Sequence, residues 1–237
     1  LEVSVSGSSL ERKLCSRVSS REIISKQVFV KIVMVEYKLR YFNLRGRGEP
    51  IRWIFHHTGM EFEDERIEQE DWAEIKSTFT YEQVPVLEFD GKGIFGSQPI
   101  CRFLARLFGL CGQDDVEAAK CDEYVDAFQD IINAYVSFLK ASDEEQKEEI
   151  KGELLEKLCP KYFTIYEDVI AQREGGKFLV EEGVTWADLY IAAWLDTFLQ
   201  MDENILEPFP HLTALREEVR GLPGIKEWLQ NRPETLI

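Results

Sequence analysis

The pattern of apolar and polar residues changes character near residue 110 of the 237-residue chain. Between residues 34 and 109, short apolar runs typical of strands alternate with segments in which apolar residues recur every three or four positions, the spacing of a helix. After a short linker at 110–115, only the helical spacing recurs. The pattern therefore predicts an α/β domain at 34–109 followed by an all-α domain at 116–237.

The first domain is expected to run in the order strand, helix, strand, then a β-hairpin and a last helix. Pro50 suits the first turn of a helix, and Ser97 suits the N-cap position of the last helix. Asp90 and Gly91 suit a hairpin turn. The expected ranges are 35–42, 50–58, 62–67, 84–89, 94–95 and 97–107.

The second domain is expected to begin with a long helix, because its apolar residues repeat at spacings of three and four: Val125, Phe128, Ile132, Tyr135 and Leu139. Helix is also expected over 150–170, with a kink or a break at Pro160. Thr185 and Asp188 form a capping box that predicts a further helix start, and Pro223 opens a last helix.

Residues 1–33 differ in composition from the rest of the chain. Six basic and three acidic residues give this segment a charge of +3, so the total of −16 leaves −19 on residues 34–237. The segment has no clean apolar core of the kind that a signal peptide carries. Two interpretations stay open, namely a flexible extension and a basic tail that lies on its own acidic body.

Composition argues against several classes of function. A net charge of −16 disfavours nucleic acid or an anionic membrane surface as a partner. The longest apolar run has seven residues, at 189–195, which predicts no membrane span. The five cysteines include no CxxC pair and the three histidines have no metal-ligand spacing, so neither a disulfide framework nor a metal site is expected. Glycine-rich nucleotide motifs are also missing.

Four stretches, in this order, resemble the sigma-class glutathione transferases: YKLRYFNLRGRGEPIR at 37–52, RIEQEDWAEIKS at 66–77, QVPVLEFDG at 83–91 and VTWADLYIAAW at 184–194. That class includes the haematopoietic type of prostaglandin D synthase, and the resemblance covers residues 35–237. The segment at 1–33 is similar to an extension that secreted nematode members of the class carry. The resemblance implies a thioredoxin-like N-terminal domain followed by an α-helical C-terminal domain.

Tyr41 is the candidate catalytic residue. Only the thiolate of glutathione attacks an electrophile, and a hydroxyl group that donates to the sulfur favours that anion. Tyr37 lies four residues earlier on the same strand face and competes for this role on spacing alone. The resemblance selects Tyr41, which directly precedes Phe-Asn-x-Arg-Gly. Arg47 either orients Tyr41 or the γ-glutamyl end of glutathione, or is a solvated loop charge.

The resemblance assigns further residues to glutathione. Trp72 and Lys76, four positions apart on one helical face, would donate to the glycyl carboxylate, although a core tryptophan and a solvated lysine fit the same spacing. Pro85 is expected to be cis and to leave the backbone N–H and C=O of Val84 for the cysteinyl part. Gln83 would contact the glycyl or the γ-glutamyl side.

Ser97 at a helix N-terminus suits the γ-glutamyl carboxylate. The usual pair in the family is Gln-Ser, and Gly96 stands here in place of the glutamine, which removes a side-chain contact and puts the affinity for glutathione in question. Asp130 matches a residue that reaches across a dimer interface to the γ-glutamyl amine in the neighbouring subunit. An ordinary solvated acidic face is the alternative for Asp130. Gln129 replaces an acidic residue beside it, so no bound metal is expected.

The pocket for the second substrate is expected between the domains, near Phe42, Tyr135, Phe138 and Tyr190, although the same spacing fits a core. The implied function is conjugation of glutathione, as co-substrate, to apolar electrophiles by a homodimer, with prostaglandin H to D isomerisation as a further activity. The alternative is an S-crystallin-like structural or glutathione-binding protein with little activity. A secreted protein is expected from the extension, with a cytoplasmic one as the alternative.

Overall fold

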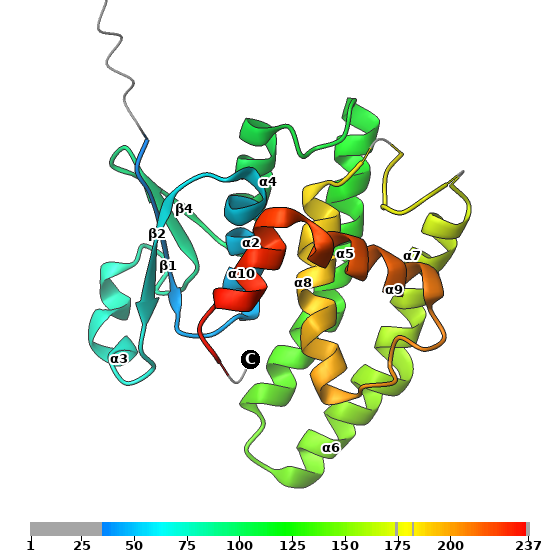
Figure 1. Ribbon diagram of the computed structural model, residues 1–237. Helices are drawn as coiled ribbons and strands as arrows, with labels where there is room; N and C mark the ends of the chain where they lie inside the picture. Colours follow the sequence, from blue (N-terminus) through cyan, green and yellow to red (C-terminus); the bar gives the residue numbers. More distant parts are fainter. Residues whose placement is uncertain (1–34, 174, 182, 236–237) are drawn as a thin grey trace, which may run out of the picture. The chain divides into compact units, whose positions relative to one another are not determined.

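The computed structural model describes residues 35–173, 175–181 and 183–235. The predictions for the extension at 1–33 lie outside the described residues. Within the described part, a small β-sheet with its helices comes first in the chain and a larger group of helices follows (Figure 1). Among these helices none is long and apolar enough to cross a lipid bilayer.

The sheet has four strands in the described residues, ordered β2-β1-β3-β4. Strands β1 and β2 are parallel, whereas β3 runs antiparallel to both β1 and β4. A parallel pair needs a crossover, and helix α2 supplies it. The bounds are Tyr37–Phe42 for β1, Glu49–Thr58 for α2, Phe62–Ile67 for β2, Val86–Phe89 for β3 and Lys92–Phe95 for β4. The predicted order of elements and the thioredoxin-like fold of this domain are confirmed.

The two faces of β1 differ as period-two alternation requires. Tyr37, Leu39 and Tyr41 are buried, while the residues between them are partly exposed. The buried face looks toward α2 and α4 (Ser97–Phe108), which Figure 1 shows between the sheet and the helical domain. Helix α3 (Trp72–Ile75), followed by a 3-10 turn, lies on the other side of the sheet.

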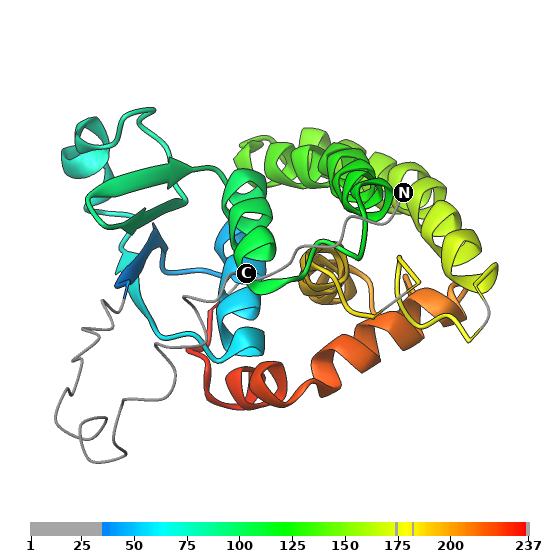
Figure 2. The ribbon, with the colours of Figure 1, turned by 90° about the horizontal axis from the view of Figure 1, so that it is seen from above.

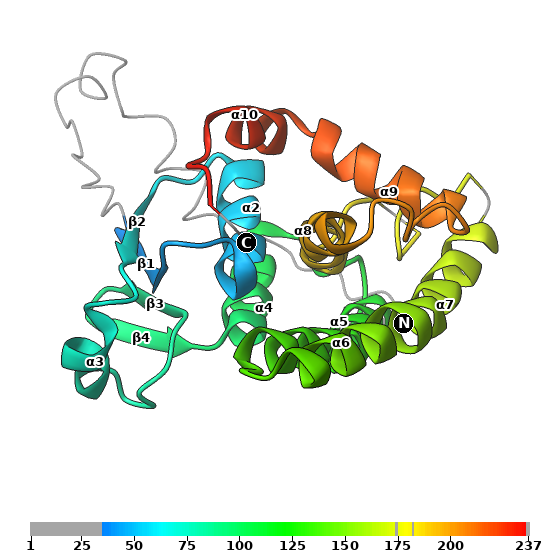
Figure 3. The same cartoon turned by 90° about the horizontal axis from the view of Figure 1, so that it is seen from below.

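The helical domain is built around α8. Every residue of α8 from Trp186 to Phe198 is buried, as expected for a helix that is covered on all sides. Figures 2 and 3 show α8 nearly end-on, with α5 on one side and α9 on the other. The bounds are Asp115–Lys140 for α5, Glu144–Glu153 for α6, Cys159–Ala171 for α7, Trp186–Met201 for α8, Pro210–Gly221 for α9 and Pro223–Asn231 for α10.

The structure agrees with some of the predicted helix ends and differs from others. The helix predicted over 150–170 is not broken at Pro160: a π-helical segment at Leu154–Leu158 joins α6 to α7, and Pro160 lies in the first turn of α7. The capping box of Thr185 and Asp188 is confirmed at the start of α8. The prediction that Ser97 is an N-cap is wrong, since Gly96 takes that position and the Ser97 side chain bonds to Tyr190 instead.

Candidate functional site

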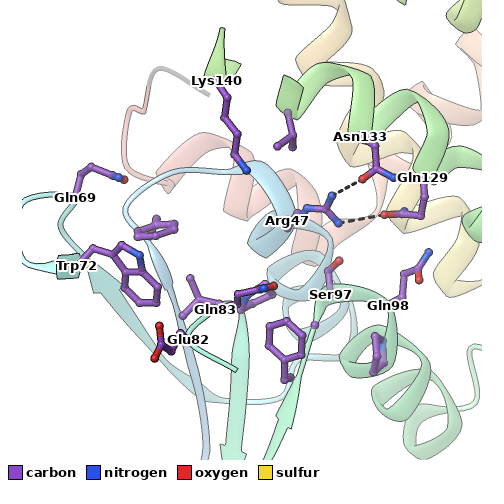
Figure 4. A pocket seen from close by; sticks show the side chains of 17 residues that line it. Arg47, Gln69, Trp72, Glu82, Gln83, Ser97, Gln98, Gln129, Asn133 and Lys140 are labelled. Carbon is purple, nitrogen blue, oxygen red and sulfur yellow. Dashed lines mark hydrogen bonds between the residues drawn. The ribbon is translucent and has the colours of Figure 1, made fainter. Parts of the chain in front are cut away.

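A cavity of about 720 Å³ opens between the edge of the sheet and helix α5 (Figure 4). Its volume lies in the range usual for small-molecule sites. Eight of the residues predicted for the site line it: Phe42, Arg47, Trp72, Gln83, Val84, Pro85, Gly96 and Ser97. The cavity therefore gathers residues from four separate segments of the thioredoxin-like domain.

One wall of the cavity comes from α5 and was largely missed from the sequence. Gln129, Asn133, Val136 and Lys140 line this wall at spacings of four, three and four, which place them on one helical face. This stripe runs beside the apolar face that was predicted for the same helix. The spacing was readable in the sequence, but nothing local indicated that this face meets a cavity.

Tyr41 does not line the cavity and lies against the 3-10 turn η1 (Gly46–Gly48). A Cβ atom on Gly46 would sit 2.9 Å from the Tyr41 hydroxyl oxygen, and one on Gly48 only 2.5 Å from its ring, so glycine is needed at both positions. The Arg47 backbone N–H donates to the Tyr41 hydroxyl at 3.1 Å. The hydroxyl thus accepts one hydrogen bond and keeps its own proton for another partner.

Burial raises the pKa of Tyr41, against the opposing effects of the Arg47 backbone hydrogen bond and the charges of Arg47 and Arg52. The hydroxyl consequently stays protonated at neutral pH and acts as a donor. Tyr37, the competing tyrosine, packs in the core against Phe55 and Phe89, with ring centroids 5.5 and 5.8 Å away. Of the two tyrosines, only Tyr41 meets the turn that carries Arg47.

The Arg47 side chain crosses to the helical wall. Its guanidinium donates to Gln129 Oε1 at 3.2 Å and to Asn133 Oδ1 at 3.0 Å, as the dashed lines in Figure 4 show. Arg47 is therefore a held side chain and not a solvated loop charge. Its backbone orients Tyr41, while its side chain connects η1 to α5.

The structure separates the two predicted ligands of the glycyl carboxylate. Trp72 lines the cavity, with its ring edge-on to Phe42 at a centroid distance of 5.1 Å. Lys76 does not line it and instead lies 3.9 Å from Glu82, with both side chains about half exposed or more. Glu82 lines the cavity and was not predicted.

The Val84–Pro85 peptide bond is cis, as predicted. Val84 precedes β3, and neither its N–H nor its C=O forms a hydrogen bond with another described residue. The Pro85 carbonyl accepts from the Gly96 N–H at 2.9 Å, which joins the start of β3 to the start of α4. Val84, with this unpaired backbone, lines the cavity next to Gln83.

Gly96 has a conformational reason to be glycine. Its φ of 92° and ψ of 140° fall in a region that glycine adopts readily and other residues do not. A Cβ atom there would also lie 3.3 Å from the Pro99 ring. A glutamine at this position of this backbone would be strained, so Gly96 fits the local geometry and needs no loss of function to explain it.

Of the four residues predicted for the second-substrate pocket, only Phe42 lines the cavity. Tyr190 is fully buried, and its hydroxyl lies 3.1 Å from Ser97 Oγ. Tyr135 lies in the core of the helical domain, where Phe138 packs against it at 6.3 Å. Val136 faces the cavity instead of Tyr135, because a helix turns by about 100° from one residue to the next.

Asp130 is exposed and lies outside the cavity of its own chain. Its carboxylate accepts a hydrogen bond from Tyr162 of α7. Its role toward a second subunit stays a prediction. Among the described residues, no group of three or more histidine, cysteine, aspartate or glutamate side chains is arranged to hold a metal ion.

These features define a two-domain protein with a cavity of about 720 Å³ that lies beside a thioredoxin-like sheet and is lined by both apolar and polar residues. Comparison with known families agrees with this plan. The N-terminal domain of glutathione S-transferases matches residues 37–106, and the C-terminal domain of the same family matches residues 129–232.

Individual relatives match along nearly their whole length. Glutathione S-transferase 3 of Caenorhabditis elegans is 41% identical over 205 residues, which cover 85% of this chain and 99% of that protein. Hematopoietic prostaglandin D synthase of Gallus gallus is 39% identical over 204 residues, or 86% of this chain and all of that protein. The solved structure of monomeric Na-GST-3 from the hookworm Necator americanus has 35% identity and a TM-score of 0.79, and covers 86% of this chain and all of that one. The chain therefore belongs to the glutathione S-transferase family, enzymes that use glutathione as co-substrate.

Proposed function

We propose that this protein is a sigma-class glutathione transferase that activates the glutathione thiolate for attack on apolar electrophiles. The observation that carries the proposal is the unpaired backbone of Val84, a residue that lines the same cavity as Trp72 and Ser97. Glutathione is a short peptide with a carboxylate at each end. An unpaired backbone edge pairs with a peptide, and donors beyond each end of that edge suit the two carboxylates.

The chemistry is assigned to Tyr41. Tyr41 does not itself line the cavity, but its protonated hydroxyl accepts from the backbone N–H of Arg47, which does, and we assign to this hydroxyl the hydrogen bond that stabilises the glutathione thiolate. The thiolate then attacks the electrophile, a carbon–sulfur bond forms, and the leaving group departs with the electron pair of the broken bond. Trp72 would hold the glycyl carboxylate, and Ser97 with the α4 N-terminus would hold the γ-glutamyl carboxylate.

Prostaglandin H to D isomerisation is proposed as a second activity, supported by the 39% identity to a protein named as a prostaglandin D synthase. The same thiolate attacks one oxygen of the endoperoxide, so a sulfur–oxygen bond forms and the oxygen–oxygen bond breaks. The second oxygen leaves as an alkoxide with the electron pair of that bond and takes up a proton to become the hydroxyl group. The carbon that bears the sulfur-bonded oxygen then loses a proton, the sulfur–oxygen bond breaks, and the ketone and the thiolate are formed. Glutathione is regenerated and no outside oxidant is needed.

Retention on immobilised glutathione, followed by a colorimetric conjugation assay, tests the main proposal. We expect retention, elution by free glutathione, and turnover of an aromatic chloride. Retention without turnover of that substrate or of prostaglandin H would favour the S-crystallin-like alternative. Failure to be retained would contradict both readings of the site.

We also propose a homodimer in which Asp130 reaches the ligand bound by the partner chain. The exposed position of Asp130, outside its own cavity, supports this arrangement. Light scattering on the purified protein measures the mass directly, and a monomeric mass would contradict the dimer. Secretion is proposed on the strength of the extension at 1–33, and native protein found only inside cells would contradict it.

A further inference from the structure

A relay of four hydrogen-bonded side chains, three of which line the cavity, joins the two domains. The Arg47 guanidinium donates to Gln129 Oε1 at 3.2 Å, and Gln129 Nε2 donates to the Tyr190 hydroxyl at 3.2 Å. The Tyr190 hydroxyl in turn lies 3.1 Å from Ser97 Oγ. Four side chains thus connect the η1 turn, α5, α8 and the first residue of α4, and Figure 4 shows three of them at the cavity, namely Arg47, Gln129 and Ser97.

The donor and acceptor properties of these groups fix the direction of each hydrogen bond in the relay. A guanidinium only donates, so Gln129 turns its carbonyl oxygen toward Arg47 and its NH₂ group away. That NH₂ group donates to the Tyr190 hydroxyl and, at 3.3 Å, to the backbone oxygen of Val125. Tyr190 therefore accepts from Gln129, and its single proton is directed to Ser97 Oγ.

Ser97 consequently accepts from Tyr190 and retains its own hydroxyl proton for a different acceptor. In the described part of the chain, Tyr190 is the one hydrogen-bond partner of the Ser97 side chain. Ser97 lines the cavity as the first residue of the 12-residue helix α4, where the helix dipole favours negative charge. The group that fits this position is a carboxylate, which accepts from the hydroxyl and from the helix terminus.

The relay is protected from competing partners. Tyr190 is fully buried, so water does not replace Gln129 or Ser97 as its partner. Burial raises the pKa of Tyr190 to about 12, and the hydroxyl therefore keeps the proton that it donates to Ser97 throughout the pH range of an assay.

We propose that Gln129 and Tyr190 are positioning residues that hold the Ser97 hydroxyl as a donor to the α-carboxylate of the γ-glutamyl group. This inference rests on the proposed function, because it takes glutathione as the ligand. It also gives the helical domain a specific part in binding, since the two residues come from α5 and α8. Through Arg47, the relay connects to the turn that holds Tyr41.

Gln129→Glu tests the direction of the hydrogen bonds from Gln129 through Tyr190 to Ser97. The substitution keeps the size of the side chain but makes it an acceptor only. A glutamate accepts from Arg47 and from Tyr190, so Tyr190 loses its donor function toward Ser97, and Ser97 must donate to Tyr190 instead. The lone pairs of Ser97 then face the ligand carboxylate, and we expect the affinity for glutathione, measured by calorimetry, to fall about tenfold or more.

Asn133→Asp is the matched control for charge. It adds the same negative charge to the same wall and beside the same arginine, but Asn133 has no hydrogen bond to Tyr190 among the described residues. We expect a loss of about threefold or less from this variant, since an exposed charge pair contributes little. An equal loss in both variants would assign the effect to charge and overturn the relay.

Tyr190→Phe removes the central hydroxyl, and we expect about a fivefold to tenfold loss of affinity with little change in kcat. Tyr166→Phe is its control, because the Tyr166 hydroxyl is also buried in the helical domain and donates to the Tyr124 backbone oxygen at 2.9 Å. This control should retain the affinity of the wild type. The thermal midpoint of each variant shows whether it is folded.

A second ligand distinguishes positioning of the Ser97 hydroxyl by Gln129 and Tyr190 from a general structural role of these two residues. In glutathione whose γ-glutamyl α-carboxylate is converted to an amide, Ser97 has no carboxylate to meet. Gln129→Glu and Tyr190→Phe should then bind this analogue as the wild type does. Equal losses for both ligands, or no loss for glutathione, would overturn the relay alone. A wild-type protein that binds neither ligand would overturn the proposed function and the relay with it.

Discussion

Among the described residues, Glu49 in the thioredoxin-like domain and Asp188 in the helical domain have almost fully buried carboxylates, yet their surroundings are opposite. Glu49, the first residue of α2, accepts from Arg232 at 2.8 Å and from the indole N–H groups of Trp228 and Trp53 at 2.9 and 3.0 Å. Arg52 lies 3.4 Å from its second oxygen. In the helical domain, Asp188 accepts only from neutral donors, which are the backbone N–H of Leu179 and the N–H and hydroxyl of Thr185.

The difference teaches that burial alone does not decide the charge state of these groups. Burial raises the pKa of Glu49, but the charges of Arg52 and Arg232 outweigh it and the pKa is lowered. Burial likewise raises the pKa of Asp188, and here the neutral hydrogen bonds do not outweigh it, so the pKa reaches about 6. A helix N-terminus is common to both carboxylates, so the nearby arginines make the difference.

Each carboxylate supports one side of the candidate site. Arg52, held by Glu49, donates to the Leu44 carbonyl oxygen at 2.8 Å just before η1, and its guanidinium carbon lies 5.9 Å from the centroid of the Tyr41 ring. Asp188 completes the capping box of α8, two residues before Tyr190. Glu49 and its arginines thus support the turn beside Tyr41, to which the chemistry is assigned. Asp188 and its neutral donors support the start of the helix that carries Tyr190, to which positioning is assigned.

The largest effect is expected from Glu49→Gln. The substitution removes the negative charge that the buried Arg52 and the partly buried Arg232 share, and Arg52 keeps only its ion pair with Asp64. The free energy of unfolding in urea titration should therefore fall by about 3 kcal/mol. Glu63→Gln is the control, since Glu63 pairs with Lys38 at an exposed position and its loss should change stability little. Equal stabilities of the two variants would contradict the claim that the buried Glu49 carboxylate is stabilised by its arginine partners.

Tyr41→Phe tests whether the chemistry belongs to the thioredoxin-like domain. It removes one hydrogen bond to a charged sulfur, so kcat should fall about 10- to 150-fold while glutathione affinity changes little. Tyr37→Phe serves as the control because Tyr37 packs in the core near Phe55. Full activity in Tyr41→Phe with a loss in Tyr37→Phe would reverse the assignment.

Asp188→Asn tests the raised pKa of Asp188 through the pH dependence of stability. Because folding raises the pKa of Asp188 from an ordinary 3.8 to about 6, the folded state binds the proton more tightly. The stability that this group contributes is present below pH 4 and is lost as the pH rises through about 6. Asp188→Asn should remove this fall, on the order of 1–3 kcal/mol, from unfolding curves measured at pH 4 to 7.

Folding shifts the pKa of Glu49 in the opposite direction, so Glu49→Gln provides the contrast in the same experiment. Its folded pKa is lowered, and its stability is present above the ordinary value of 4.5 and lost as the pH falls through the lower folded value. If the wild type and Asp188→Asn show the same pH dependence between 4 and 7, folding does not raise the pKa of Asp188.

The smallest effect is expected from Asp130→Asn, which asks whether the site is complete within one chain. Loss of a charged partner for the γ-glutamyl amine should weaken glutathione binding about threefold to tenfold in calorimetry, with no change in the unfolding midpoint. Asp126→Asn is the control, since Asp126 is also exposed on α5 and lies 3.9 Å from Arg102. Unchanged binding in Asp130→Asn would indicate that the partner chain contributes nothing through this residue.

The sequence by itself determined the features whose causes lie within a few residues. The strand expected at 35–42 is β1 (Tyr37–Phe42), and β2 has the predicted bounds of 62 and 67. The capping box of α8 was read from two residues three positions apart, because its hydrogen bonds are local. The motif around Pro85 was sufficient to predict the cis peptide bond by resemblance.

Only the tertiary structure decided which side chains meet at the site. Ser97 looked like a local helix cap, but its partner is Tyr190, 93 residues further along the chain. Tyr135 is buried on the predicted apolar face, although Leu139 at the end of that face is exposed, and the adjacent Val136 faces the cavity. The physical reason is that period and capping depend on neighbouring residues, while the face that a helix turns to a cavity depends on how distant segments pack, as Arg47 and Gln129 do across 82 residues.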